Sequence, residues 1–176
     1  MELTMIISTL NQIVNRVLAT ALIIFMGAMI LTVVWQVFTR FIINDPSVFT
    51  DELSRYLLIW IGILGGAYTY SVKRHLALEL VMPKLNFRNR NLLSIFINLL
   101  VITFSSIALI YGGSMVVATT LQHHQISPGL AIGGNHLLIG YVYVVLPLSG
   151  VLINYYGLLD IFASIANIAS GKKGDK

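Results

Sequence analysis

Four stretches dominated by apolar residues follow one another along the chain, separated by short polar turns. They cover residues 17–43, 50–72, 91–120 and 137–159. A helix needs about 20 apolar residues to cross the hydrocarbon of a bilayer, and each stretch is at least that long. The pattern therefore predicts an all-α membrane protein with four transmembrane helices, which form a single domain over residues 1–170.

Shorter segments of different character lie outside these helices. From Leu3 to Val17, apolar residues recur at helical spacing with polar residues on the other face, which predicts an amphipathic lead-in to the first helix. Residues 75–82 are mostly apolar but too short to cross, so they predict an interfacial segment between the second and third helices. The glycine-rich stretch 123–136 is expected to be a turn, and residues 171–176 a basic cytoplasmic tail.

Composition and charge agree with a lipid environment. The chain is 57% hydrophobic and only 10% charged, whereas soluble domains are about 25% charged. After Arg90 the next charged residue is Asp160, which leaves an uncharged gap of 69 residues. That gap has room for two membrane-crossing helices and the turn between them.

Lysine and arginine are distributed unevenly along the chain, and cytoplasmic segments of membrane proteins carry the excess. If the N-terminus is inside, nine of these residues fall on cytoplasmic segments: Arg16, Lys73, Arg74, Lys84, Arg88, Arg90, Lys172, Lys173 and Lys176. Only Arg40 and Arg55 fall on the other side. The bias predicts that both termini lie in the cytoplasm.

Charged residues gather where the first helix ends and the second begins. Arg40 lies at the end of the first helix, and Asp51, Glu52 and Arg55 lie at the start of the second. Spacings of three and four residues place Arg55 on one helix face with both acids. The cluster can be a solvated helix end, or an ion-pair cluster that fixes the two helices or docks a partner. Because Arg40 and Glu52 are opposite in charge and share this position, we expect them to lie close together.

The second helix is rich in glycine. Gly62 and Gly66 form a GxxxG pair, with Gly65 between them, and such pairs permit close helix approach in lipid. The alternative is that glycine is simply common in membrane helices. In the fourth segment, Pro147 predicts a kink, because proline removes a backbone hydrogen bond and clashes with the preceding turn.

No pattern of residues predicts catalysis, a metal site or a cofactor. The chain has no cysteine, which excludes disulfides and thiolate chemistry. Its four histidines fall in expected loops, without the helical pairing typical of haem proteins or the converging ligands of zinc sites; they are His75, His123, His124 and His136. There is no P-loop, Gly-x-Ser-x-Gly or His-Glu-x-x-His motif. We expect a protein that is not an enzyme and binds no nucleic acid.

One series of motifs is more specific. Gln36-Val37-x-x-Arg40-Phe41 is followed by Asp45-Pro46, Thr50-Asp51-Glu52-Leu53-x-Arg55-Tyr56-x-x-x-Trp60, Gly65-Gly66-Ala67 and Arg74-His75. The series closely resembles the signature of the small membrane subunit, the Q component, of tripartite ATP-independent periplasmic (TRAP) transporters. Length and the four-helix plan extend the resemblance to the whole chain. One departure is Asn135-His136, which stands where an aromatic residue commonly opens the last helix of this family.

The resemblance implies a function that composition does not indicate. Such subunits partner a much larger inner-membrane subunit that carries substrate and sodium, while a periplasmic binding protein delivers an organic acid, such as a dicarboxylate or a sialic acid. The small subunit would brace the large one and offer a docking surface. The resemblance gives structural or docking roles to Gln36, Arg40, Asp51, Glu52, Arg55 and Trp60. It extends to His75 at the inner end of the second helix.

Two other functions stay open at this stage. An independent four-helix transporter is disfavoured, because no stretch holds a mid-membrane carboxylate to bind or couple an ion. A membrane scaffold or assembly factor unrelated to transport has the same composition as a transporter subunit. Only the motif between Gln36 and His75 distinguishes a transporter subunit from such a scaffold.

Overall fold

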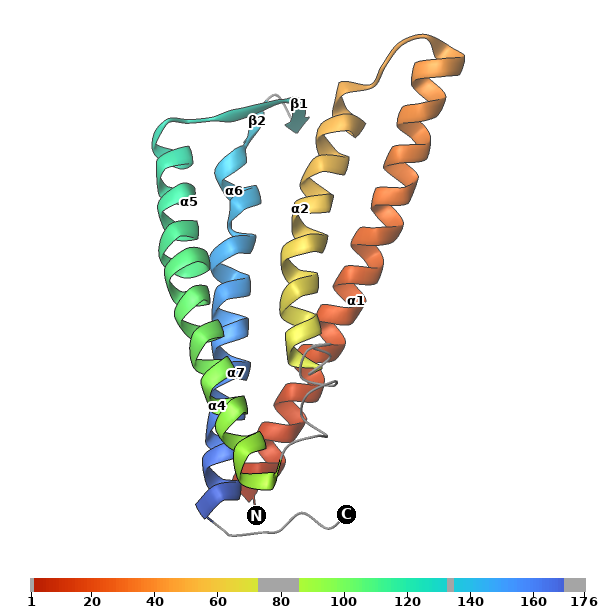
Figure 1. Cartoon of the computed structure of the whole chain (residues 1–176). Helices are drawn as coiled ribbons and strands as arrows, with labels where there is room; N and C mark the ends of the chain where they lie inside the picture. Colours follow the sequence, from red (N-terminus) through yellow and green to blue (C-terminus); the bar gives the residue numbers. More distant parts are fainter. Residues whose placement is uncertain (1, 73–85, 133–134, 170–176) are drawn as a thin grey trace.

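The computed structural model describes residues 2–72, 86–132 and 135–169. Within these ranges the protein consists of long helices and one two-stranded β hairpin (Figure 1). The predicted interfacial segment 75–82, His75 and the tail 171–176 lie outside the described residues, so these predictions are not tested.

The first helix, α1, spans Glu2–Phe38 and continues as a π-helical segment, η1, over Thr39–Ile43. The predicted lead-in is therefore no separate element, because the helix runs from it into the apolar stretch without a break. Asn44 ends the helix in a left-handed conformation, with φ of 59°, and its N–H bonds to the Thr39 carbonyl. After this turn, α2 runs over Val48–Ser71.

The next helix is continuous but changes its winding near the middle. It comprises α4 (Phe87–Phe104), a π-helical segment η3 (Ser105–Gly112) and α5 (Gly113–Gln122). The last helical part is α6 (Ile139–Tyr143) followed by α7 (Val145–Ala169). It ends ten residues beyond the expected end at residue 159, because the apolar pattern continues after Asp160.

The stretch 123–136 was expected to be a simple turn, and here the prediction is wrong. Strands β1 (Ile126–Ile132) and β2 (Asn135–Leu138) pair antiparallel, with Ala131 opposite His136. The register is irregular between Ile126 and Ala131. Pro128 falls in this interval, where a missing backbone N–H removes no regular ladder bond. The last helix accordingly begins at Ile139 rather than at residue 137.

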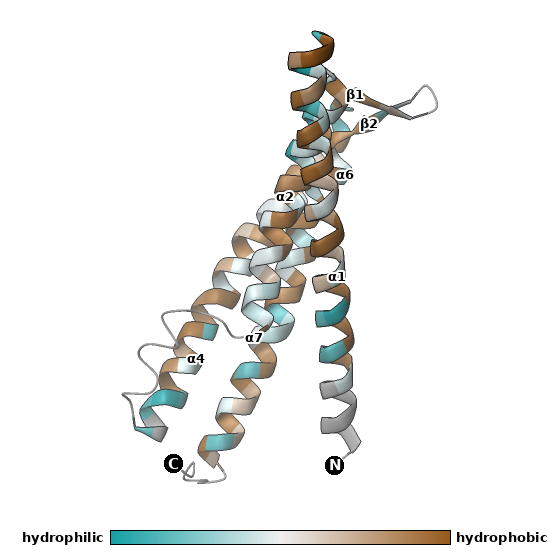
Figure 2. Ribbon diagram, turned by 90° about the vertical axis from the view of Figure 1, so that its right-hand side faces the viewer, coloured by the Kyte–Doolittle hydropathy of each residue, from teal (hydrophilic) through white to brown (hydrophobic). Residues whose placement is uncertain are grey.

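Among the described residues, three helical stretches are long and apolar enough to cross a bilayer: Thr9–Ile43, Asn89–Gln122 and Ile139–Ala169. In Figure 2, the ribbon is coloured hydrophobic over much of α1 and hydrophilic at several positions toward its start. Together with exposed apolar residues on every long helix, these stretches identify an all-α membrane protein. α2 is not among the three, so a fourth crossing remains a prediction.

Hydrogen bonds between side chains tie α7 to the start of α1. The hydroxyl of Tyr155 donates to Asn11 Oδ1 at 2.9 Å, and that of Tyr156 donates to Asn15 Oδ1 at 2.8 Å. Both asparagines belong to the polar face of the predicted lead-in. Through these bonds this part of α1 packs in the helix bundle, where polar groups in lipid find partners on another helix.

α7 also bonds to the other long helices. The contacts are Ser149 Oγ to the Ile63 carbonyl (3.1 Å), Ser105 Oγ to the Gly150 carbonyl (3.1 Å), and Asn154 Nδ2 to Ser106 Oγ (2.8 Å). Farther along, Tyr70 of α2 donates to Asn98 Oδ1 of α4 at 2.5 Å. α7 is thus hydrogen-bonded to α1, α2 and η3, so it is the central helix of the bundle.

The two ends of the bundle differ in shape. In Figure 1, the start of α1 and the end of α7 lie at one end, where the helices converge. At the other end, α1 and α2 diverge from α5 and α6, and the β hairpin reaches across between them. We call the part of the bundle with the start of α1 and the end of α7 the closed half. We call the part with the start of α2, the β hairpin and α6 the open half.

Candidate functional site

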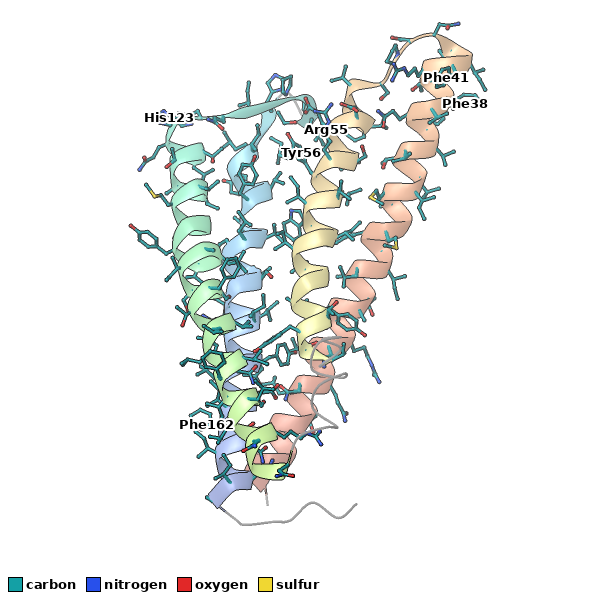
Figure 3. All side chains as sticks on the ribbon, in the orientation of Figure 1. Phe38, Phe41, Arg55, Tyr56, His123 and Phe162 are labelled. Atoms are coloured by element: carbon teal, nitrogen blue, oxygen red, sulfur yellow. The ribbon has the colours of Figure 1, made fainter. Side chains whose placement is uncertain are left out.

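The predicted charged cluster lies in the open half, at the start of α2. Figure 3 shows Arg55 and Tyr56 on α2 near the β hairpin, with Phe38 and Phe41 at the far end of the α1–η1 helix. Within α2, Arg55 forms an ion pair with Asp51. The same carboxylate accepts a hydrogen bond from Gln36 Nε2 of α1 at 2.8 Å. Gln36 and Asp51 therefore connect the two helices directly.

The expected contact between Arg40 and Glu52 is absent, and this prediction is wrong. The Arg40 side chain is exposed, with its guanidinium 5.9 Å from the centroid of the Phe41 ring. Arg55, rather than Arg40, is the arginine that pairs with an acid of this cluster, namely Asp51. Consecutive helix residues point in different directions, so Asp51 faces α1 while Glu52 faces the hairpin.

Glu52 anchors the β hairpin to α2. Its Oε2 accepts hydrogen bonds from the hydroxyl of Ser127 and from the backbone N–H of Gly129, the latter at 3.0 Å. Ser127 is completely buried. A Cβ atom on Gly129 would lie 2.9 Å from the Val48 carbonyl oxygen, so only glycine allows this approach. The irregular register of β1 thus directs two donors at one carboxylate.

Ser127 and Gly129 were not predicted as site residues. They lie 75 and 77 residues after Glu52 in the sequence, and no periodicity connects positions that far apart. The available signal was chemical: Ser-Pro-Gly supplies a hydroxyl donor and a residue without a side chain, facing a helix start that carries two carboxylates.

The glycines of α2 lie on a surface that no other described part of the chain covers. A Cβ atom at Gly62, Gly65 or Gly66 would have no neighbour within 4 Å. Exposed residues recur along the same side of the helix, and we call them the open face of α2: Arg55, Leu58, Gly62, Gly66 and Thr69. The GxxxG pair therefore makes no close contact with any other helix that the structure describes.

Close helix contacts within the chain use other glycines. A Cβ atom at Gly113 would lie 2.7 Å from Leu146 Cβ, and one at Gly150 would lie 2.7 Å from Ile110 Cγ1. These two positions bring η3 and α5 against the last helix. The sequence drew attention to α2 because its glycines are clustered. Gly113 and Gly150 lie in two separate helices, so no sequence pattern connects them.

Trp60 and Pro147 contribute to packing and chain direction. The Trp60 ring meets Phe25 of α1 edge-on, with centroids 5.8 Å apart and planes at 84°. The last helix is interrupted at Val144, between α6 and α7, three residues before Pro147. Proline in the first turn of a helix needs no N–H partner, so the interruption places Pro147 where it is tolerated.

Trp60 also borders a cavity of about 300 Å³ that lies between α1, α2, the hairpin and α6. Its wall is apolar apart from the Tyr56 hydroxyl and the Trp60 indole. In the part of the chain that the structure describes, no three His, Asp or Glu side chains come together as metal ligands would.

Comparisons with known proteins assign this architecture to a family. Residues 29–167 match the family model for tripartite ATP-independent periplasmic transporters, DctQ component. The chain is 26% identical to the sialic acid TRAP transporter small permease protein SiaQ of Vibrio cholerae serotype O1, over 92% of this chain and 87% of that protein. It is 29% identical to a Haemophilus influenzae protein named "Putative TRAP transporter small permease protein", over 44% and 48% of the two chains. The chain belongs to the DctQ family, the small membrane subunits of TRAP transporters.

Proposed function

We propose that this chain is the accessory membrane subunit of a secondary active TRAP transporter. It braces the large transport subunit in the bacterial inner membrane and helps to dock the periplasmic substrate-binding protein. Four helices cross the membrane, α2 included, and both termini lie in the cytoplasm. The convergence of the start of α1 and the end of α7 at one end of the bundle supports termini on one side.

The observation that carries this proposal is the open face of α2. Side chains point away from the bundle there, and the glycines leave room for another backbone. Small residues in lipid favour association because helices can approach closely, which increases van der Waals contact. The large subunit, a membrane protein with its own apolar helices, supplies such a partner. Arg55, 70% exposed at one end of this face, is available to acceptors on that subunit.

Docking of the binding protein is assigned to the open half. Arg40 is exposed at the end of the first helix, and the hairpin is fixed to α2 by Glu52. An exposed cation at this end of the bundle suits a partner that arrives from the aqueous phase, since charge steers such encounters more than it strengthens the complex.

The transported compound is proposed to be an organic acid of the sialic acid or dicarboxylate type, with sodium as the coupling ion. The name of the Vibrio cholerae relative supports the sialic acid type. The chain itself supplies few groups for an anionic substrate, so the proposal places substrate and ion binding in the large subunit.

Co-purification tests the bracing role. The double variant Gly62→Leu/Gly66→Leu should lower recovery of the large subunit with the affinity-tagged chain at least tenfold, because two bulky side chains would separate the helices. Gly27→Leu in α1 is the matched control, since a Cβ at Gly27 also meets nothing within 4 Å. Equal recovery with both variants would contradict the assigned face. A wild-type chain that recovers no large membrane protein would favour the scaffold interpretation.

A further inference from the structure

The apolar cavity of the open half extends along one side of α2. This helix supplies half of the wall residues, from Leu53 to Trp60, which is about 10 Å of helix at 1.5 Å per residue. Single side chains from α1, the two strands and α6 complete it, namely Phe25, Leu130, Leu137 and Val142. The cavity lies on the opposite side of α2 from the open face, because its wall residues and the glycines are about half a helical turn apart.

Water is not a suitable occupant. Buried water makes two to four hydrogen bonds to polar groups, and cavities lined by apolar side chains stay dry. The wall offers only the Tyr56 hydroxyl and the Trp60 indole N–H as polar groups. A volume of about 300 Å³ is nevertheless at the lower end of the range for pockets that hold small molecules, roughly 300–1,000 Å³.

The cavity is continuous with the lipid-facing surface of the protein. It is open rather than enclosed, and the residues beside its wall are exposed and apolar. Met26, next to Phe25, is 49% exposed, and Tyr141, next to Val142, is 57% exposed. In a membrane protein these positions contact acyl chains, so the same lipid phase reaches the mouth of the cavity.

Its depth also fits the hydrocarbon of one leaflet. The Glu52 carboxylate and its partners on β1 lie directly above the cavity wall, one residue before Leu53 in α2. Charged groups are costly at mid-membrane and persist near the surface. The cavity therefore begins at the level where headgroups give way to acyl chains, with Leu130 and Leu137 of the hairpin as its roof.

We propose that this cavity is a phospholipid site, which holds one acyl chain of a lipid from the leaflet on the hairpin side. The chain fills the space between α2 and α6 and supports the hairpin from below. The site is independent of the proposed transport function, because it is lined entirely by this subunit and faces away from the open face of α2.

Tryptophan fluorescence tests the site, since the chain has two tryptophans and one of them borders the cavity. In the full-length variant Trp35→Phe, Trp60 is the sole tryptophan. Reconstituted into phosphatidylcholine vesicles, its emission should fall at least twofold when the lipid carries bromine at carbons 9 and 10 of its acyl chain. Trp60 emission that is insensitive to brominated lipid would overturn the proposal.

Filling the cavity separates a bound lipid from casual lipid contact. Adding Val142→Phe or Leu130→Phe to Trp35→Phe should reduce the quenching by half or more, because each ring occupies the space of the acyl chain. Leu58→Phe, on the open face, is the matched control and should leave quenching unchanged. If the filling variants and the control variant changed the quenching equally, the proposed lipid site would be contradicted. Two filling variants on different elements are used so that one folding failure does not decide the result.

Photo-crosslinking in native membranes identifies the occupant. A benzoylphenylalanine residue in place of Leu137 should give a phospholipid adduct, visible as a matching mass increase of the purified chain. An adduct dominated by another membrane protein would show that the cavity is a docking site for a partner helix, and would overturn the lipid assignment.

Discussion

The two halves of the bundle are held together by different means. In the closed half, hydroxyl and amide side chains bond α7 to its neighbours, and glycines such as Gly150 bring backbones close. In the open half, α1 and α2 diverge from α5 and α6, and the β hairpin that Glu52 fixes to α2 connects them. Gly62 of α2 lies at the same level as Gly150, because Ile63 bonds to Ser149, but a Cβ atom at Gly62 would meet nothing within 4 Å. The bonded contacts of α7 stabilise the chain itself, while the open half and the open face of α2 present space and surface to lipid and to partners.

The largest expected effect comes from adding volume to the closed half. Gly150→Leu should destabilise the isolated chain by about 3 kcal/mol or prevent folding, because overpacking costs typically 1–3 kcal/mol and even a Cβ there would lie 2.7 Å from Ile110. Gly62→Leu, the matched change on the open face of α2, should leave stability within about 0.5 kcal/mol. Denaturation in detergent, followed by circular dichroism, measures both. Equal losses would remove the distinction between a glycine packed against another helix and a glycine on the open face of α2.

A smaller effect is expected from weakening the anchor of the hairpin. Glu52→Gln removes a charged acceptor, and hydrogen bonds to charged groups contribute about 1.5–3 kcal/mol. Since the chain has no native cysteine, Leu130→Cys reports hairpin opening through its rate of maleimide labelling. The rate should rise about tenfold when Glu52→Gln is added. Asp51 faces α1 instead, so Asp51→Asn should leave the labelling rate unchanged. An equal rise with Asp51→Asn would contradict the role of Glu52 as the anchor of the hairpin.

Single polar contacts of α7 should contribute less. Tyr156→Phe removes the hydrogen bond to Asn15, and interhelical bonds in membrane proteins average about 0.6 kcal/mol. The double variant with Asn15→Leu should be less destabilised than the sum of the single changes. Strict additivity in this double-mutant cycle would show that the two side chains do not interact.

The smallest effect on stability is expected at Arg40. Its side chain is exposed beside the Phe41 ring, so Arg40→Ala should change the unfolding free energy by less than about 0.5 kcal/mol. If Arg40 helps to dock the binding protein, the same variant should slow association with that protein, most clearly at low salt. A loss of stability without a change in association would exclude a docking role.

The sequence predicted the long helices well, because length and apolar content determine whether a segment suits a bilayer. It also predicted the charged cluster, since Asp51 and Arg55 are neighbours within one helix. The partner of Glu52 was mispredicted because charge and approximate position favoured Arg40, whereas the donors come from a hairpin 75 residues away. The packing roles of Asn11 and Asn15 were missed for a similar reason. The sequence assigned them only to the polar face of the lead-in, and their partners lie more than 140 residues away on α7.

The open face of α2 provides the most direct test of the account as a whole. Benzoylphenylalanine placed at Leu58, which is 60% exposed on this face, should crosslink in native membranes to a membrane protein much larger than this 19.5 kDa chain. The same residue placed at Ile23, 72% exposed on α1, should give that adduct several-fold less. Adducts with lipid alone at Leu58, in cells that express the complete transporter, would contradict the assignment of α2 as the bracing helix.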